Sequence, residues 1–285
     1  MKGIILAAGI GTRLFPLTKP ISKQLLPLFD KPMIFYPLST LIYMGIKDIL
    51  CIVKKEDILN FKALLGNGKH LGIKINYVIQ DSPNGIAESF ILAEKFIGND
   101  NVTLILGDNI YYGLNFENIL FDLDQGISSK IFICKVANPQ RYGVVVFKGN
   151  KIKKIEEKPK KPKSSHVVTG LYIYSNDVIR ISKNLIPSKR NELEITDVNN
   201  IYLNKKKLDF VKLPISIFWQ DVGTPEALIQ ASEFIRSIQD RQDILIGSPE
   251  LIALKKNFIS KKQIKKLINS YPKGYYRSKL ERLTS

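Results

Sequence analysis

A glycine loop near the start of the chain carries the residue types that bind phosphate groups. Gly9 and Gly11 follow an apolar run at residues 3–8, and Arg13 and then Lys23 come after them. Glycines let the backbone approach a phosphate closely, and successive backbone N–H groups can form an anion-binding nest. An arginine and a lysine close to such a loop suit a triphosphate. The loop therefore predicts a triphosphate site.

Two better-known nucleotide loops do not match this segment. The dinucleotide fingerprint needs a third glycine where Leu14 stands, and the Walker A loop needs a Gly-Lys-Ser/Thr run that the segment lacks. On spacing alone, Lys23 could also be a solvated surface lysine. The loop taken alone is thus a weak signal.

Two aspartates that follow apolar runs are candidate metal ligands. Asp108 stands in the run LGDN, and Asp221 stands in the run WQDVGT. Mg²⁺ prefers one or two carboxylates together with substrate phosphates. Either aspartate alone could be only a turn residue or a helix cap. A shared cation would explain both.

A charged segment at residues 156–159 is a candidate sugar-phosphate site. Glu157 and Lys158 precede Pro159 at the end of an expected strand. The segment could be only a charged loop. Alternatively, Lys158 could hold a phosphate while Glu157 accepts hydrogen bonds from sugar hydroxyls.

The elements that must position these residues alternate between strand and helix in the first part of the chain. We expect strands at residues 3–8, 46–53, 73–80 and 102–106, and helices at residues 33–44, 57–65 and 86–96. This alternation predicts an α/β fold with a Rossmann-like, mostly parallel sheet and helices on both faces. Ligands of such sheets bind beyond the carboxyl ends of the strands, where the glycine loop and Asp108 fall.

The pattern changes in the second part of the chain. Strands without intervening helices are expected at residues 131–137, 142–147 and 151–156, with a turn at Gly149 and Asn150. A further strand at 167–174, a helix at 195–203, a strand at 208–213 and a long helix at 224–241 follow. We expect a catalytic domain at residues 1–241 and a C-terminal helical extension packed on it at residues 242–285.

The composition excludes several classes of protein. The chain has 285 residues and a formal net charge of +17, but its lysine clusters lack the interleaved aromatic residues of a nucleic-acid site. Cys51 and Cys134 lie in apolar runs and are expected to be buried. No apolar run of 18 residues and no signal-peptide pattern occurs, so we expect a cytoplasmic protein without membrane spans. His70 and His166 are expected to be surface or structural residues.

Eight motifs in order specify a family: GIGTRLFPLT, ISKQLLP, LGDN, RYGVV, EEKP, VTGLYIY, ELEITDVN and WQDVGT. Over essentially its whole length, the chain resembles the glucose-1-phosphate thymidylyltransferases of the long bacterial type. The resemblance implies a nucleotide-binding sheet, a sugar-binding subregion, a small C-terminal helical lobe and a homotetramer. It also implies Mg²⁺-dependent synthesis of dTDP-glucose and pyrophosphate from dTTP and glucose 1-phosphate, the first step of dTDP-rhamnose-type sugar biosynthesis.

The resemblance implies a role for each candidate residue. Phosphate handling falls to Arg13, Lys23 and Lys158, and metal ligation falls to Asp108 and Asp221. Other nucleotide contacts fall to Ala8, Gly9, Gly11, Gln80 and Gly85. The sugar and its phosphate would be contacted by Asn109, Gly143, Glu157, Val168, Tyr172 and Arg190.

Two departures from the family pattern and three alternative functions stay open. Asn84 replaces an acid in a turn that Asn-Gly forms equally well. Gln220 replaces an apolar residue beside Asp221 and leaves the geometry of that carboxylate open. The alternatives are a uridylyl- or cytidylyltransferase on the same fold, a non-catalytic sugar-nucleotide-sensing subunit, and a nucleic-acid-binding protein motivated by the charge.

The resemblance also implies a second site, near a subunit interface, through which dTDP-rhamnose inhibits long-type enzymes. The family usually has a His, an Arg, a Glu and an Arg where this chain has Leu114, residues 214–216, Leu251 and Lys255. Lysine cannot reproduce a bidentate arginine clamp on a diphosphate, and each lost hydrogen bond to a charged ligand costs roughly 1.5–3 kcal/mol.

We therefore expect an active enzyme with little end-product inhibition, unless residues of the lysine-rich C-terminus rebuild the site. Titration of dTDP-rhamnose at saturating dTTP checks this expectation. Clear inhibition at micromolar dTDP-rhamnose would contradict it.

Overall fold

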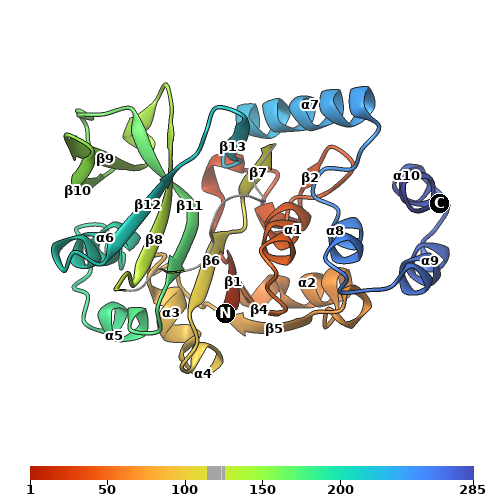
Figure 1. The fold of residues 1–285 in the computed structure, drawn as a ribbon, viewed down its shortest axis with the longest axis horizontal. Coiled ribbons are helices and arrows are strands. Elements are labelled where there is room, and N and C mark those ends of the chain that lie inside the picture. The colour runs from red at the N-terminus through yellow and green to blue at the C-terminus, as the bar shows by residue number, and fades with distance from the viewer. Residues whose placement is uncertain (114–122, 124–125) are drawn as a thin grey trace. The chain divides into compact units, whose positions relative to one another are not determined.

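The computed structural model describes residues 1–113, 123 and 126–285 (Figure 1). The chain divides into two compact units. Unit 1 comprises Met1–Ile4, Ser82–Ile105 and Gly113–Trp219, and unit 2 comprises Ile5–Asp81, Leu106–Tyr112 and Gln220–Ser285. Strands and helices occur in both units, which confirms the expected α/β class.

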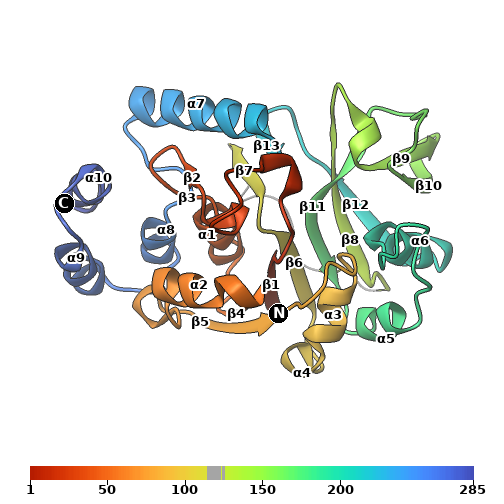
Figure 2. The ribbon, with the colours of Figure 1, turned by 180° about the vertical axis from the view of Figure 1, so that it is seen from behind.

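Unit 2 contains a pair of parallel strands, of which the first is a nearly continuous apolar run. β4 (Asp48–Val53) pairs in parallel with β5 (Lys74–Ile79), and α1 (Phe35–Tyr43) and α2 (Ile58–Leu65) flank β4 in sequence. β1 (Lys2–Ala7) ends in this unit. Five of the six residues of β4 are buried, as expected for a parallel strand that is covered on both faces. In Figure 2, α2 lies along β5.

Unit 1 contains the antiparallel part of the fold. β11 (His166–Tyr174) pairs antiparallel with β6 (Val102–Leu106), β8 (Ser129–Lys135) and β9 (Gly143–Lys148). β10 (Lys151–Glu157) pairs antiparallel with β9 across the predicted turn, and β12 (Leu208–Lys212) pairs in parallel with β8. The helices of this unit are α3 (Glu88–Leu92), α4 (Glu94–Ile97), α5 (Val178–Lys183) and α6 (Ile195–Asn204).

Several sequence-based expectations need correction. The helix expected at 86–96 is two short helices separated at Ala93. The strands that were not expected include β7 (Asn109–Gly113) and β13 (Ile217–Asp221), which pair with each other. Each is only five residues long, and its partner lies far away in sequence, so no local pattern announces it. Cys51 is buried as expected, but Cys134 is only half-buried.

The C-terminal part of unit 2 is helical. It comprises α7 (Pro225–Gln242), α8 (Pro249–Lys255), α9 (Lys261–Ser270) and α10 (Tyr275–Thr284). α8 packs against α1, and α9 packs against α10. The expected boundary at residues 241 and 242 falls at the end of α7, and a separate extension at 242–285 remains a proposal. None of the described helices is long and apolar enough to span a membrane.

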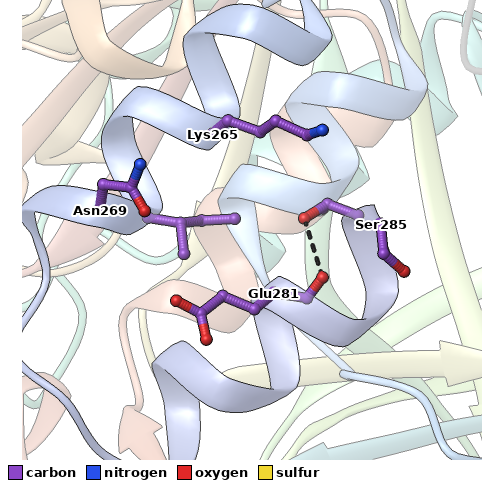
Figure 3. Close-up of a pocket in the computed structure, with 6 residues that line it drawn as sticks. Lys265, Asn269, Glu281 and Ser285 are labelled. Carbon is purple, nitrogen blue, oxygen red and sulfur yellow. Dashed lines mark hydrogen bonds between the residues drawn. The ribbon is translucent and has the colours of Figure 1, made fainter.

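An open hollow lies between α9 and α10 but holds none of the expected site residues. Its lining residues are Lys265, Ile268, Asn269, Glu281, Thr284 and Ser285 (Figure 3). The Thr284 hydroxyl already donates to the carbonyls of Leu280 and Glu281. Of the positions tied to the second site, Leu114 lies outside the described residues. Leu251 and Lys255 lie on α8, with the Lys255 ammonium 5.6 Å from the centre of the Tyr43 ring.

A buried ion pair joins the β2–β3 hairpin to the C-terminal helices. The hairpin consists of β2 (Pro27–Leu28) and β3 (Lys31–Pro32), and the Lys31 ammonium pairs with the Asp30 carboxylate. The ammonium also donates to the Ile246 carbonyl at 3.0 Å, and the Gln239 amide donates to Asp30 at 3.0 Å. Burial lowers the pKa of Lys31, and the charge of Asp30 opposes that shift. Both side chains are at least 97% buried, so each charge depends on the other.

We expect Lys31→Met to destabilise the protein by about 3–5 kcal/mol, because it leaves the Asp30 carboxylate buried without a counterion. Urea denaturation measures the change in the free energy of unfolding. Lys262→Met is the matched control, because Lys262 is exposed on α9. A loss below about 1 kcal/mol, the scale of an exposed ion pair, would contradict the role of the pair.

Candidate active site

Hydrogen bonds within unit 2 fix the shape of the glycine loop that follows β1. The Ser22 hydroxyl contacts the Ala7 carbonyl at 3.3 Å and the Gln24 side-chain oxygen at 2.7 Å, and the Thr18 hydroxyl donates to the Gly11 carbonyl at 3.0 Å. Gly11 has a φ of 70°, in the left-handed region, and a Cβ at this position would lie 3.0 Å from the Thr18 methyl group. Both observations favour glycine at this position.

Lys23 and Asp108 meet beside this loop. A Cβ on Gly9 would lie 3.8 Å from the Lys23 ammonium, and that ammonium forms an ion pair with the Asp108 carboxylate. The Asn109 amide donates to the other oxygen of Asp108 at 3.1 Å. Burial by itself would raise the pKa of Asp108, but Lys23 and these hydrogen bonds hold it below its usual range. The carboxylate is thus ionised, although only 7% of the Asp108 residue is exposed.

Gly107 explains why Asp108 can lie so close to the loop. Its N–H donates to the Leu6 carbonyl of β1 at 2.9 Å, and a Cβ at this position would lie 2.8 Å from the Gln24 side chain. A larger residue here would therefore have to displace Gln24 and the end of β1.

Asp221 is brought to the same place by the pairing of β7 with β13. The backbone N–H of Val222 donates to the Asp108 carbonyl at 2.9 Å, so the segments that carry the two aspartates run side by side. A Cβ on Gly223 would lie 2.7 Å from the Arg13 guanidinium and 3.1 Å from an Asp221 carboxylate oxygen. The structure therefore gathers Arg13, Lys23, Asp108 and Asp221 in unit 2.

The donor set of these two aspartates fits a hard divalent cation. The described residues contain no group of three or more His, Cys, Asp or Glu side chains that could hold a metal. Two carboxylates therefore suit a metal ion whose remaining ligands are water and substrate phosphates, rather than a metal enclosed by protein ligands.

Gln220 donates its side-chain amide to the Ala227 carbonyl of α7 at 3.2 Å, so this departure from the family pattern is turned toward the helix.

The two residues expected to face the base are both constrained. Gln80 directly follows β5 in unit 2, is buried, and donates its backbone N–H to Val53 at 3.0 Å. Gly85, in unit 1, has a φ of 104°, and a Cβ there would lie 2.4 Å from the Leu193 carbonyl oxygen. The Asn84 side-chain amide donates a hydrogen bond to the Glu88 carboxylate at 2.7 Å. An ionised aspartate, the usual residue at this position in the family, has no N–H or O–H group with which to form this bond.

The residues expected to bind the sugar phosphate gather in unit 1 around Glu157, the last residue of β10. Its carboxylate accepts a hydrogen bond from the Thr196 hydroxyl and lies 3.2 Å from the Arg190 guanidinium. Gly143 is its register partner on β9, and a Cβ there would lie 3.7 Å from a Glu157 oxygen. The Lys158 ammonium lies 3.6 Å from the same carboxylate. This group of charges can meet both hydroxyls and a phosphate.

Val168 and Tyr172, the other expected sugar residues, are buried on β11. The register between β11 and β8 shifts between these two residues.

Some residues of the site were not assigned from the sequence. Thr196 and Glu194 belong to the quoted motif ELEITDVN, and Gly223 belongs to WQDVGT, but none of them was assigned a role. Their importance depends on side-chain contacts with residues that are distant in sequence, except for the Glu194–Arg190 pair. That pair has the spacing of four residues that would have signalled an ion pair on a helix, but Arg190 precedes α6.

The two histidines lie in different surroundings. Burial lowers the pKa of His70, and burial together with Lys212 and Lys135 lowers the pKa of His166. The His166 ring packs edge-on against Phe147. Both are therefore neutral at pH 7.

Comparisons with known proteins show the family of the chain. The nucleotidyl transferase family matches residues 2–238. The glucose-1-phosphate thymidylyltransferase of Neisseria meningitidis is 47% identical over 285 residues, which is 99% of each chain. That of Mycolicibacterium smegmatis is 48% identical over 265 residues, which is 93% of this chain and 92% of the relative.

Two solved structures of sugar nucleotidyltransferases have a fold similar to that of this chain. A putative glucose-1-phosphate thymidylyltransferase from Bacillus anthracis, in complex with a sucrose, has a TM-score of 0.76 and 41% identity, and covers 84% of this chain and 96% of its own. A UDP-glucose pyrophosphorylase complexed with UDP-glucose has a TM-score of 0.71 and 25% identity, and covers 83% and 98%. The chain therefore belongs to the nucleotidyl transferase family and, within it, to the family of the glucose-1-phosphate thymidylyltransferases.

Proposed function

We propose that the chain transfers a thymidylyl group from dTTP to glucose 1-phosphate, giving dTDP-glucose and pyrophosphate. The observation that carries this proposal is the gathering of Arg13, Lys23, Asp108 and Asp221 beside a glycine loop. It occurs in a chain 47% identical, over its length, to a glucose-1-phosphate thymidylyltransferase. The product would supply dTDP-rhamnose-type sugar biosynthesis in the cytoplasm, and the enzyme would act as a homotetramer.

The reaction needs charge neutralisation more than it needs a nucleophile from the protein. A sugar phosphate with a second pKa of about 6 is mostly dianionic at neutral pH. One of its oxygens forms the new bond to the α-phosphorus in line, the bond from that phosphorus to the bridging oxygen breaks, and pyrophosphate leaves with the electron pair. No proton has to be removed, so the two histidines are not required. The protein must position two polyanions and offset their charge.

The residues of unit 2 would hold the nucleotide. The backbone of Ala8, Gly9 and Gly11 contacts it, and Arg13 and Lys23 hold the triphosphate and the departing pyrophosphate. Gln80, and Gly85 of unit 1, would face the thymine.

Family members generally use a divalent metal ion, and we propose Mg²⁺, held by Asp108 and Asp221. When bound, the ion supplies further positive charge at the phosphates.

The residues of unit 1 would hold the acceptor. Lys158 and Arg190, which both lie beside Glu157, would contact the phosphate of glucose 1-phosphate. Glu157 would accept hydrogen bonds from sugar hydroxyls. Gly143, Val168 and Tyr172 would form the rest of the sugar site in this unit. Asn109 is also expected to contact the sugar.

One assay tests the function against its alternatives. Pyrophosphate release is measured for each pairing of dTTP, UTP and CTP with sugar 1-phosphates. We expect the highest kcat/KM for dTTP with glucose 1-phosphate. A preference for UTP, which the likeness to a UDP-glucose pyrophosphorylase makes the nearest alternative, would replace thymidylyl transfer by uridylyl transfer. No turnover with any pair would favour a sensing subunit.

Asp108→Asn and Asp221→Asn are each expected to lower turnover by on the order of 100-fold or more, the scale seen when one preorganised electrostatic contact is lost. Initial rates at saturating Mg²⁺ measure the effect. Asp240→Asn, on the exposed face of α7, is the control. Near-normal turnover in either variant would remove that aspartate from the metal site.

Arg13→Ala is expected to lower kcat/KM by a factor that corresponds to at least about 2.7 kcal/mol, because the guanidinium beside Asp221 would no longer stabilise charge in the transition state. Steady-state kinetics with each substrate varied in turn measures the loss. Arg236→Ala, also exposed on α7, is the control. A change confined to the KM for glucose 1-phosphate would show that Arg13 serves the acceptor instead.

A further inference from the structure

The guanidinium of Arg190 is surrounded by three carboxylates, and these are not equivalent. The Nη2 atom lies 2.8 Å from both oxygens of Glu194, and Nε donates to Glu194 at 3.2 Å. Single contacts of 3.2 Å join Nη2 to Glu157 and to Glu192. The Glu194 side chain is 8% exposed, whereas that of Glu192 is 36% exposed. Glu194 is therefore the carboxylate that determines the orientation of Arg190.

Glu194 is itself held in place before it meets Arg190. The Ser188 hydroxyl donates to its carboxylate at 2.7 Å, and the same hydroxyl oxygen accepts the backbone N–H of Arg190 at 3.2 Å. The loop is closed by bonds from Ser188 N–H to the Glu192 carbonyl at 2.9 Å and from Asn191 N–H to the Ser188 carbonyl at 2.8 Å. Glu194 precedes α6 but makes no side-chain capping bond to that helix. Its carboxylate is thus directed to the guanidinium instead.

Glu194 pairs with one edge of the guanidinium of Arg190, and Nη1 lies on the other edge. A guanidinium offers its N–H groups in a planar fork, with one edge formed by Nε and Nη2 and the other by Nη1 and Nη2. Glu194 occupies the first edge. Among the described residues, no hydrogen bond to Nη1 is formed, and 39% of the Arg190 side chain is exposed. Nη2 of the second edge contacts Glu157 and Glu192, so a phosphate could bind at Nη1 while Glu194 keeps the first edge paired.

We infer that Glu194 is a positioning residue for the acceptor phosphate, and this inference rests on the proposed function. By holding the Nε–Nη2 edge, Glu194 presents the Nη1 side of Arg190 to the phosphate of glucose 1-phosphate. Because Glu194 pairs with Arg190, it also weakens the contact between Arg190 and Glu157. Glu157 then stays available to accept hydrogen bonds from sugar hydroxyls. Without Glu194, the guanidinium would pair with Glu157 and Glu192, and the incoming dianion would have to compete with both carboxylates.

The test compares Glu194→Gln with Glu192→Gln in the full-length protein. Each change removes one carboxylate that contacts the same guanidinium, but only Glu194 makes the bidentate contact. For Glu194→Gln, we expect the KM for glucose 1-phosphate to rise by about tenfold or more, the effect of losing one charge-assisted hydrogen bond. The KM for dTTP should stay within about twofold, and Glu192→Gln should leave both values within about twofold of wild type.

A double-mutant cycle separates positioning from general damage. Arg190→Ala is measured in the wild-type and in the Glu194→Gln background. Because Glu194 acts through Arg190, the second change should add little to the first. If Glu194→Gln does not fold, Ser188→Ala, which removes only the hydroxyl that holds Glu194, should raise the same KM by a smaller factor.

The outcomes are distinguishable. An unchanged KM for glucose 1-phosphate in Glu194→Gln, or losses that multiply independently in the cycle, would overturn the positioning role. If the wild-type protein does not turn over dTTP with glucose 1-phosphate, the proposed function fails, and this inference fails with it. If wild type is active and Arg190→Ala raises the KM while Glu194→Gln does not, only this inference fails.

Discussion

The contact between the Lys23 ammonium and the Asp108 carboxylate is the interaction on which the nucleotide half of the site depends. The carboxylate lies in a buried position, where an isolated charge would be neutralised rather than tolerated. Lys23 keeps Asp108 ionised, and Asp108 keeps Lys23 beside the glycine loop. Gly107 packs closely against the end of β1, where a Cβ would lie 2.8 Å from the Gln24 side chain and 3.0 Å from the Leu6 carbonyl oxygen, and Asp108 is the next residue.

The proposed chemistry explains why cations and glycines are prominent in this site and why nucleophiles are not. When the attacking phosphate already carries its charge, catalysis consists of bringing two polyanions together in a fixed geometry. Each cation must then be held in place by a neighbouring carboxylate that does not occupy all of its hydrogen-bond donors. Lys23 is held by the carboxylate of Asp108, which is also the proposed metal ligand. Arg190 is held along one edge by Glu194, and among the described residues its Nη1 group makes no hydrogen bond.

The net charge of +17 does not by itself determine which charges are available in the proposed site. Many of the lysines lie on exposed faces, such as that of α9. None of the proposed site residues lies on α9. Within the site, local pairs determine which charges are available. Long-range attraction of anionic substrates would add to the rate of encounter, and salt would weaken it.

The amino-acid sequence by itself determined the chemistry of the candidate residues and most of the regular elements. The apolar run of β4 and the periodicity of α7 are local patterns, and the structure places both close to where they were expected. The types of Gly11, Arg13, Lys23 and Asp108 likewise indicated phosphates and a metal ion before any contact was known.

Only the tertiary structure decided which of these residues meet. The pairing of β7 with β13 brings Asp221 beside Asp108 although more than a hundred residues separate them, and neither strand has a local pattern strong enough to announce it. The contact of Glu194 with Arg190 depends on a closed loop ahead of α6, and only part of that loop belongs to the motif ELEITDVN. Local patterns reflect the backbone's own preferences, whereas a site is made by side chains whose positions depend on distant packing.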